Sequence, residues 1–147
     1  MPVSADPMSY TLDNFNSELP AFLGELTNWA FDNDIELDSR GHSWSGWMLW
    51  RACGQESTNS CRGMKLTTYA PASMQNWLTI RNAIADFEGD GRLIYGFMDP
   101  LALPTLGPAA LTGAYSNQNV DATVLNTGHG LESILDNVTT VAALATK

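Results

Sequence analysis

The sequence predicts a mainly α-helical fold with about four helices in bundle-like packing, a small two-stranded β element and a long irregular loop over residues 99–130. Apolar residues recur at spacings of three and four in several segments, as in amphipathic helices, whereas only two short segments are rich in β-branched and aromatic residues. The chain has 147 residues, 44% of them hydrophobic, which is enough for one well-filled core. We therefore expect an extended N-terminal arm over residues 1–10, followed by one globular domain over residues 11–147.

The helical spacing predicts a first helix at about 18–32, a third at about 72–87 and a last at about 130–145. A second helix is expected to begin at Ser43 or Ser45, because either hydroxyl can accept a free backbone amide of the first turn. Helices with one apolar stripe bury that stripe against one another, which favours a bundle.

Two segments have the composition of strands. The stretch "GMKLTTYAP" is bounded by Gly63 and Pro71, and "RLIYGFM" follows the helix-ending "EGDG". The acidic stretch "DNDIELD", residues 32–38, suits a short exposed strand or a solvated turn.

Residues 99–130 contain prolines at 100, 104 and 108, many small residues and only two charged ones. Loops longer than about 12–15 residues are uncommon in compact domains and are often functional or bound to a partner. Exposed apolar stretches usually mark contact surfaces. We therefore predict an interface made by this loop and the Trp-rich second helix, comprising Leu101, Leu103, Leu106, Leu111, Tyr115, Trp44 and Trp47.

The net charge is −9, from 16 acidic and 7 basic residues. Such a surface repels phosphate, so a membrane surface is not expected as a partner, and nucleic acid is expected only as a packaged genome. No apolar run is long enough to span a membrane, and the first residues lack the layout of a signal peptide. These features predict a soluble intracellular product.

The two cysteines, Cys53 and Cys61, match no zinc or redox motif. For an intracellular protein we expect two reduced thiols, with a disulfide across the polar loop as the alternative.

The stretch "GHSWS", residues 41–45, resembles the G-x-S-x-G elbow of serine hydrolases, in which glycines flank a nucleophilic serine on a strained turn. That elbow needs a preceding strand, a following helix, and a histidine and an acid from later loops of a large parallel sheet. Here glycine arrives one residue late, at Gly46, His129 is the one histidine that follows, and few segments are strand-like. The sequence therefore favours Ser43 as a helix cap and predicts no catalytic residues.

The best metal candidate is "DFEGDGRLIYGF", in which Asp86, Glu88, Asp90 and Gly91 match the first part of an EF-hand calcium loop. The last ligand of such a loop is a bidentate Glu, and Phe97 stands there instead. We therefore predict a solvated turn, and no metal or other cofactor.

These observations together predict a non-enzymatic structural subunit of a larger symmetric assembly: a viral or phage virion protein such as a coat, capsid-associated or tail-junction protein. Its partners would be copies of itself and other assembly proteins, and it would be made in the host cytoplasm. The order of elements is similar to the layout of rod-shaped plant virus coat proteins. That resemblance implies a four-helix bundle whose inner loop grips RNA, with Arg81 and Arg92 as the phosphate contacts.

Two alternatives come from other classes of protein. One is a monomeric regulatory module that binds a protein through the Trp-rich helix. The other is a small serine hydrolase, which would need Ser43 or His129 to line a pocket.

Overall fold

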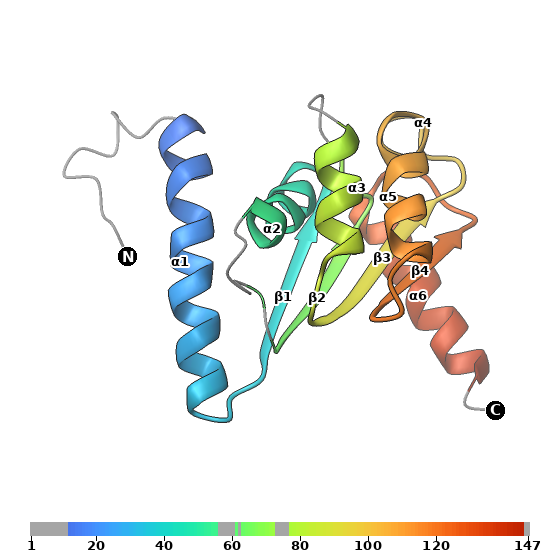
Figure 1. Ribbon diagram of the computed structural model, residues 1–147. Helices are drawn as coiled ribbons and strands as arrows, with labels where there is room; N and C mark the ends of the chain where they lie inside the picture. The colour runs from blue at the N-terminus through green and yellow to red at the C-terminus, as the bar shows by residue number, and fades with distance from the viewer. Residues whose placement is uncertain (1–11, 56–60, 62, 73–76, 146–147) are drawn as a thin grey trace.

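The computed structural model describes residues 12–55, 61, 63–72 and 77–145, and this part of the chain has an α/β fold. Four strands form one sheet in the order β1-β2-β3-β4, and every neighbouring pair is parallel (Figure 1). The strands are β1 (Leu37–His42), β2 (Met64–Tyr69), β3 (Asp90–Gly96) and β4 (Val120–Leu125). The predicted helix bundle with a small β element is therefore wrong.

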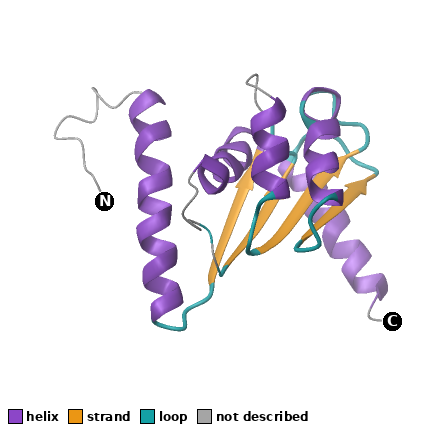
Figure 2. Cartoon of the chain, in the orientation of Figure 1, coloured by secondary structure: helices purple, strands orange, loops and turns teal. Residues whose placement is uncertain are grey.

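Helices cover both faces of this sheet. The described helices are α1 (Leu12–Asp32), α2 (Ser43–Gln55), α3 (Trp77–Ala85), α4 (Ala102–Thr105), α5 (Gly107–Tyr115) and α6 (Leu131–Ala145). Figure 2 shows α2, α3 and α5 side by side on one face, α1 beyond α2, and α6 behind the sheet. Consecutive parallel strands need a crossover segment between them, and α2, α3 and the α4–α5 pair lie in these crossovers.

The Trp-rich helix α2 belongs to the core. Trp47 and Trp50 are 1% and 0% exposed, whereas Trp44 remains exposed. The indole N–H of Trp50 donates to the Thr68 hydroxyl on β2 at 2.6 Å, and its ring packs edge-on against Phe87. Trp47, which was predicted to lie at an interface, and Trp50 therefore pack in the core and hold α2 against the sheet.

Residues 99–130 are not an irregular loop, because they contain α4, α5 and β4. Pro108 lies in the first turn of α5, where the missing N–H costs little. Gly113 packs directly on α3, since a Cβ there would overlap the backbone carbonyl of Arg81. The small residues of this segment therefore allow close packing between helices.

Two of the expected strands, at β2 and β3, are confirmed. The exposed strand or turn expected at residues 32–38 overlaps only the start of β1, which begins at Leu37, and β4 was not expected as a strand. β1 reads "LDSRGH" and lies at the edge of the sheet, where Asp38 and Arg40 are exposed and form an ion pair of 2.9 Å. The hydrogen bond from Arg40 lowers the pKa of the Asp38 carboxyl. Charged side chains are typical of edge strands, so the apolar alternation that predicts a strand is missing here.

The helix expected at 18–32 begins earlier, at Leu12, and the one expected at 72–87 is described only over Trp77–Ala85. The last helix is confirmed, as is a second helix that begins at Ser43. The expected arm over residues 1–10 lies outside the described residues. None of the described helices combines the length and the apolar character needed to cross a membrane.

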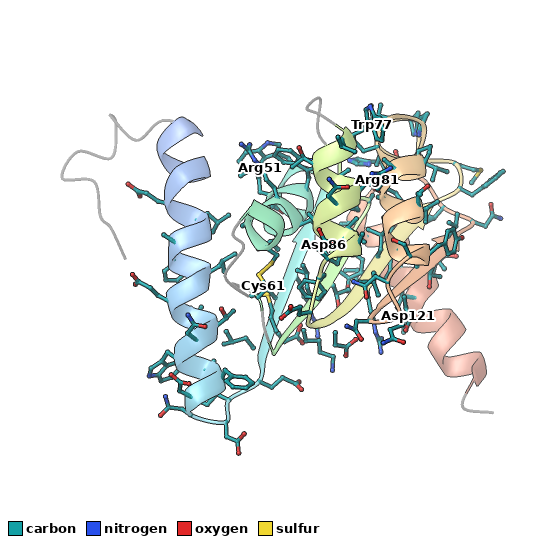
Figure 3. The ribbon with its side chains drawn as sticks, in the orientation of Figure 1. Arg51, Cys61, Trp77, Arg81, Asp86 and Asp121 are labelled. Atoms are coloured by element: carbon teal, nitrogen blue, oxygen red, sulfur yellow. A yellow bond between two sulfur atoms is a disulfide. The ribbon has the colours of Figure 1, made fainter. Side chains whose placement is uncertain are left out.

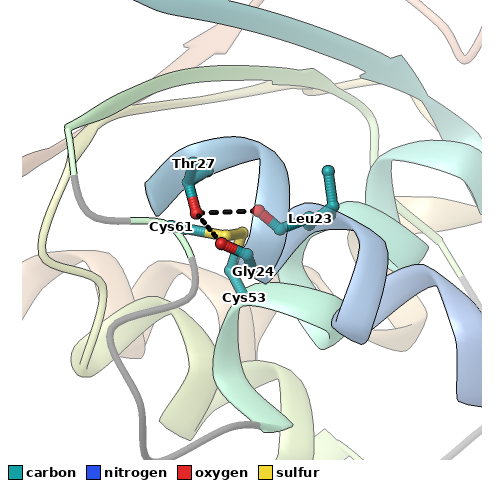
Figure 4. Close-up of a disulfide and its surroundings, with 5 residues drawn as sticks. All are labelled: Leu23, Gly24, Thr27, Cys53 and Cys61. Carbon is teal, nitrogen blue, oxygen red and sulfur yellow. Dashed lines mark hydrogen bonds between the residues drawn. A yellow bond between two sulfur atoms is a disulfide. The ribbon is translucent and has the colours of Figure 1, made fainter. Parts of the chain in front are cut away.

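Cys53 and Cys61 form a disulfide, so the expectation of two reduced thiols is wrong. The bridge joins α2 to the segment that leads into β2, with a Cα–Cα distance of 5.3 Å. Figure 4 shows it against α1, beside Gly24 and Thr27. The buried Thr27 hydroxyl donates to the Leu23 carbonyl within α1 at 2.7 Å, so this hydroxyl has a hydrogen-bond partner where α1 packs against the disulfide. The disulfide thus constrains α2 at the place where α1 covers it.

Candidate active site

Three side chains that are distant in the sequence form one chain of hydrogen bonds. His129 Nε2 lies 2.9 Å from the Ser43 hydroxyl oxygen, and His129 Nδ1 lies 2.8 Å from Asp99 Oδ2. Ser43 follows β1, Asp99 follows β3 and His129 follows β4. Because the carboxyl ends of parallel strands share one edge of the sheet, these three positions meet there.

Ser43 lies on a sharp turn between a strand and a helix. Its φ angle is +53°, in the left-handed region that a residue with a side chain rarely adopts. Such a conformation costs on the order of 1–3 kcal/mol and persists only where the surroundings hold it. The Ser43 carbonyl accepts a 3.1 Å hydrogen bond from the Ala72 amide, which follows β2. The geometry is that of a nucleophile elbow, in which the serine hydroxyl stands clear of both flanking elements.

Glycines allow the strand and the helix of this turn to approach closely. A Cβ on Gly41 would lie 2.7 Å from the Cα of Gly46, which real side chains do not tolerate. Gly46 therefore provides the close contact, one residue later than in the G-x-S-x-G pattern. Ser45, at the usual glycine position, donates from its hydroxyl to the His42 carbonyl at 2.8 Å. The departure from the pattern thus preserves the turn.

Asp99 is fixed as a carboxylate that orients His129. Its side chain is fully buried, and Oδ1 accepts hydrogen bonds from the backbone amides of Leu101 at 2.8 Å and Ala102 at 2.9 Å. Burial alone would raise the pKa of Asp99, but the hydrogen bonds from Ala102, His129 and Leu101 outweigh it, and the pKa is lowered. The group therefore carries its negative charge at neutral pH.

The proton positions of the site follow from these partners. A carboxylate can only accept, so the Nδ1 atom of His129 carries the proton in that hydrogen bond. In the neutral ring Nε2 then has a free lone pair, and it accepts the hydrogen bond from Ser43. His129 is 20% exposed and Ser43 is half-buried, so solvent reaches the site. This arrangement can remove the serine proton as the hydroxyl attacks an electrophile.

The segments that carry Asp99 and His129 are joined beyond the ends of their strands. The Phe97 amide donates to the Leu125 carbonyl at 2.6 Å, and the Met98 amide donates to the Thr127 carbonyl at 3.0 Å. A Cβ on Gly96 would overlap the Thr127 and Gly128 carbonyls, so only glycine allows this approach. Backbone contacts between residues 96–98 and residues 125–128 therefore set the distance between Asp99 and His129.

A pocket of about 220 Å³ lies beside the elbow on the α6 side of the sheet. Leu131 and Leu135 from α6 form one wall, and His42 and Tyr69 from the strand ends form another. Arg40 and Gly41 complete the lining. The lining includes His42, which directly precedes Ser43, but not Ser43 itself.

The residues predicted as an interface have different environments. Trp47 and Leu106 are buried in the core, Leu103 and Leu111 are half-buried, and Leu101, Tyr115 and Trp44 are exposed. Nothing in the fold tests whether the exposed ones contact another chain, so that assignment stays a prediction.

Arg81 and Arg92, predicted as phosphate contacts, do not come together. Arg81 is on α3, where its guanidinium lies 5.7 Å from the Trp77 ring centre (Figure 3). Arg92 is exposed on β3, opposite Asp121 in register. Its neighbour Gly91 faces Trp50 of α2, so Arg92 points to the other side of the sheet.

Asp86 and Glu88 lie in the connection between α3 and β3, and Asp90 is the first residue of β3. In the part of the chain that the structure describes, no three His, Cys, Asp or Glu side chains gather in a way that could hold a metal ion.

Sequence reasoning weighed Ser43 and His129 but gave Asp99 no role. A signal was present: Asp99 closely follows the strand-like "RLIYGFM", and the order serine, acid, histidine is that of the α/β hydrolases. It was missed because β1 and β4 were not expected to be strands, which left the sheet too small to bring the three residues together.

No protein-family model and no curated protein sequence matches the chain. Among solved structures, the fold is similar to that of a provisionally assigned dienelactone hydrolase from Klebsiella pneumoniae, with a TM-score of 0.55 and 16% sequence identity. The alignment covers 95% of this chain and 69% of the other. The likeness shows that the chain has an α/β fold, with a four-stranded parallel sheet flanked by the described helices.

This likeness contradicts the predicted non-enzymatic virion subunit. The coat-protein layout requires a helix bundle, and the chain instead has a four-stranded parallel sheet in a fold similar to that of the hydrolase structure. Of the functions expected from sequence, the small serine hydrolase is the one that this fold supports.

Proposed function

We propose that this protein is a serine hydrolase that cleaves small carboxylic esters through an acyl-enzyme. The observation that carries the proposal is the continuous hydrogen-bond chain from the Ser43 hydroxyl through His129 to the buried Asp99 carboxylate. The strained backbone of Ser43 supports it independently, because strain of this kind is typical of functional sites.

In the first half of the reaction, Ser43 Oγ forms a bond to the ester carbonyl carbon while its proton moves to His129 Nε2. The tetrahedral intermediate collapses, the bond to the alcohol oxygen breaks, and the alcohol leaves with the proton from His129. Water then attacks the acyl carbon, giving its proton to His129, and the acid is released as the Ser43 hydroxyl is restored. Asp99 keeps the ring oriented and stabilises the imidazolium that forms twice in the cycle.

The place of Ser43 at the start of α2 supports stabilisation of the intermediate. The N-terminus of a helix favours negative charge, and the carbonyl oxygen becomes negative beside it. In hydrolases with this elbow, the amide of the residue after the nucleophile forms part of the oxyanion hole, and Trp44 has that position here.

The test is covalent labelling with a fluorophosphonate probe, together with hydrolysis of p-nitrophenyl acetate. We expect the wild-type protein to be labelled on Ser43 and Ser43→Ala to be inert in both assays. Ser133→Ala, which removes an exposed serine of α6, is the matched control and should behave as wild type. A folded wild-type protein that neither reacts with the probe nor hydrolyses the ester would contradict the proposal.

A further inference from the structure

A second histidine, His42, contacts the backbone of His129. His42 Nε2 lies 2.8 Å from the His129 carbonyl oxygen, and the two rings are tilted with their centres 5.0 Å apart. A carbonyl oxygen can only accept, so the Nε2 atom of His42 carries the proton and donates it to this hydrogen bond. His42 is half-buried and stands directly before the nucleophile.

The backbone of His42 is itself held in place. Its amide donates to the Ser45 hydroxyl oxygen at 3.1 Å, and the same hydroxyl donates to its carbonyl at 2.8 Å. A Cβ at Gly41 would point at α2, and side chains alternate along a strand, so the His42 ring projects toward α6. This direction places the ring at the start of the segment that carries His129.

The close backbone contacts of the segment that carries His129 are made just before it, at Thr127 and Gly128, which approach Gly96. His129 stands between Gly128 and Gly130, and a Cβ on Gly128 would have no neighbour within 4 Å. Glycine adopts many backbone conformations, so flanking glycines do not fix the peptide of His129. Two backbone hydrogen bonds hold the segment on either side of His129. The Met98 amide donates to the Thr127 carbonyl, and the Ile134 amide donates to the Gly130 carbonyl. The His42 hydrogen bond is made at the His129 residue itself.

We propose that His42 is a positioning residue that fixes the His129 peptide and thereby aims the imidazole at Ser43. This inference rests on the proposed hydrolase function. His42 is not a second base, because its Nε2 donates to the carbonyl and so has no lone pair for the serine proton. The elbow thus supplies both the nucleophile, Ser43, and the support for its base, through adjacent residues of β1 and α2.

The experiment compares three substitutions that separate the donated hydrogen bond from the bulk of the ring. His42→Phe keeps an aromatic ring without a donor, His42→Leu removes both, and His42→Gln keeps an N–H at a similar reach. We expect the rate of fluorophosphonate labelling to fall by about tenfold or more in the first two, because a small misplacement of a catalytic group costs this much. With p-nitrophenyl acetate the loss should lie in kcat, with KM little changed. His42→Gln should restore most of the wild-type rate.

Circular dichroism and thermal melting establish whether each variant is folded. If His42→Phe is not folded, the labelling rates of His42→Leu and His42→Gln are compared instead. The inference would be overturned if folded His42→Phe and His42→Leu were labelled at the wild-type rate. It would also be overturned if His42→Gln were labelled as slowly as those two variants. Failure of the hydrolase proposal is distinguishable, because the wild-type protein would then show no labelling beyond that of Ser43→Ala.

Discussion

The Ser43 hydroxyl and the His129 Nε2 atom lie 2.9 Å apart although 86 residues separate them in the chain. Each follows a strand, and these two strands, β1 and β4, lie at opposite edges of the four-stranded sheet. The segment after β4 therefore returns across the ends of the strands to reach Ser43. The hydrogen bond from His42 to the His129 carbonyl lies at the point of this return.

Ser43→Gly should be more stable than Ser43→Ala, by about 1 kcal/mol in the free energy of unfolding. Both variants lose the hydroxyl and its hydrogen bond, but only glycine adopts the positive φ of this residue without a Cβ clash. Urea denaturation of the two proteins measures the difference. Equal stabilities would mean that the backbone at Ser43 is not strained.

Asp99→Asn should reduce kcat for p-nitrophenyl acetate by roughly 10⁴-fold, as in serine proteases whose triad carboxylate becomes an amide. An amide group oriented to donate to Nδ1 favours the wrong tautomer of His129, which can then no longer accept the Ser43 proton. Asp121→Asn, which changes an exposed acid on β4, serves as the control and should retain wild-type kcat. A loss below about tenfold would argue against Asp99 as the orienting group.

The lowered pKa of Asp99 makes stability depend on pH in a defined direction. The folded pKa is below the unfolded value of about 3.9, so the unfolded state binds more protons as the pH falls. This stabilisation is fully present above the unfolded pKa and is lost as pH falls through the folded pKa. The wild-type protein should therefore lose stability below about pH 4 more steeply than Asp99→Asn, which urea unfolding across this range measures. Parallel curves would contradict the expectation.

Removing the disulfide with Cys53→Ala and Cys61→Ala together should lower the free energy of unfolding by about 2–3 kcal/mol, because the bridge restricts the unfolded chain. The bond lies at the α1–α2 contact, whereas Ser43 is at the other end of α2, so fluorophosphonate labelling of the folded variant should be retained. Dithiothreitol should destabilise the wild-type protein and leave the double variant unaffected. An effect of the reductant on both proteins would assign the change to something other than this bond.

Leu106→Ser should lower the free energy of unfolding by about 2–5 kcal/mol, because Leu106 is 3% exposed and packs in the core. Leu101→Ser is the matched change at a 58% exposed leucine and should alter stability by less than about 0.5 kcal/mol. Light scattering of both proteins also tests whether Leu101 contacts another copy. Equal destabilisation by the two changes would contradict the burial difference between them.

The sequence by itself determined the elements whose signals are local. Helical spacing of apolar residues located the last helix and most of α1, and β-branched and aromatic composition located β2 and β3. The glycines around Ser43 also reflect a local requirement, since the β1–α2 turn needs Gly41 and Gly46 in close contact. For this reason the stretch that forms this turn can be recognised in the sequence alone.

Only the tertiary structure decided that β1 and β4 are strands and that Asp99 joins the site. Both strands lie at sheet edges, where polar side chains replace the apolar alternation, and their backbone hydrogen bonds come from partners distant in the chain. Once the four strands run parallel, their carboxyl ends share one edge, and Ser43, Asp99 and His129 are brought together by pairing that no local window of sequence contains.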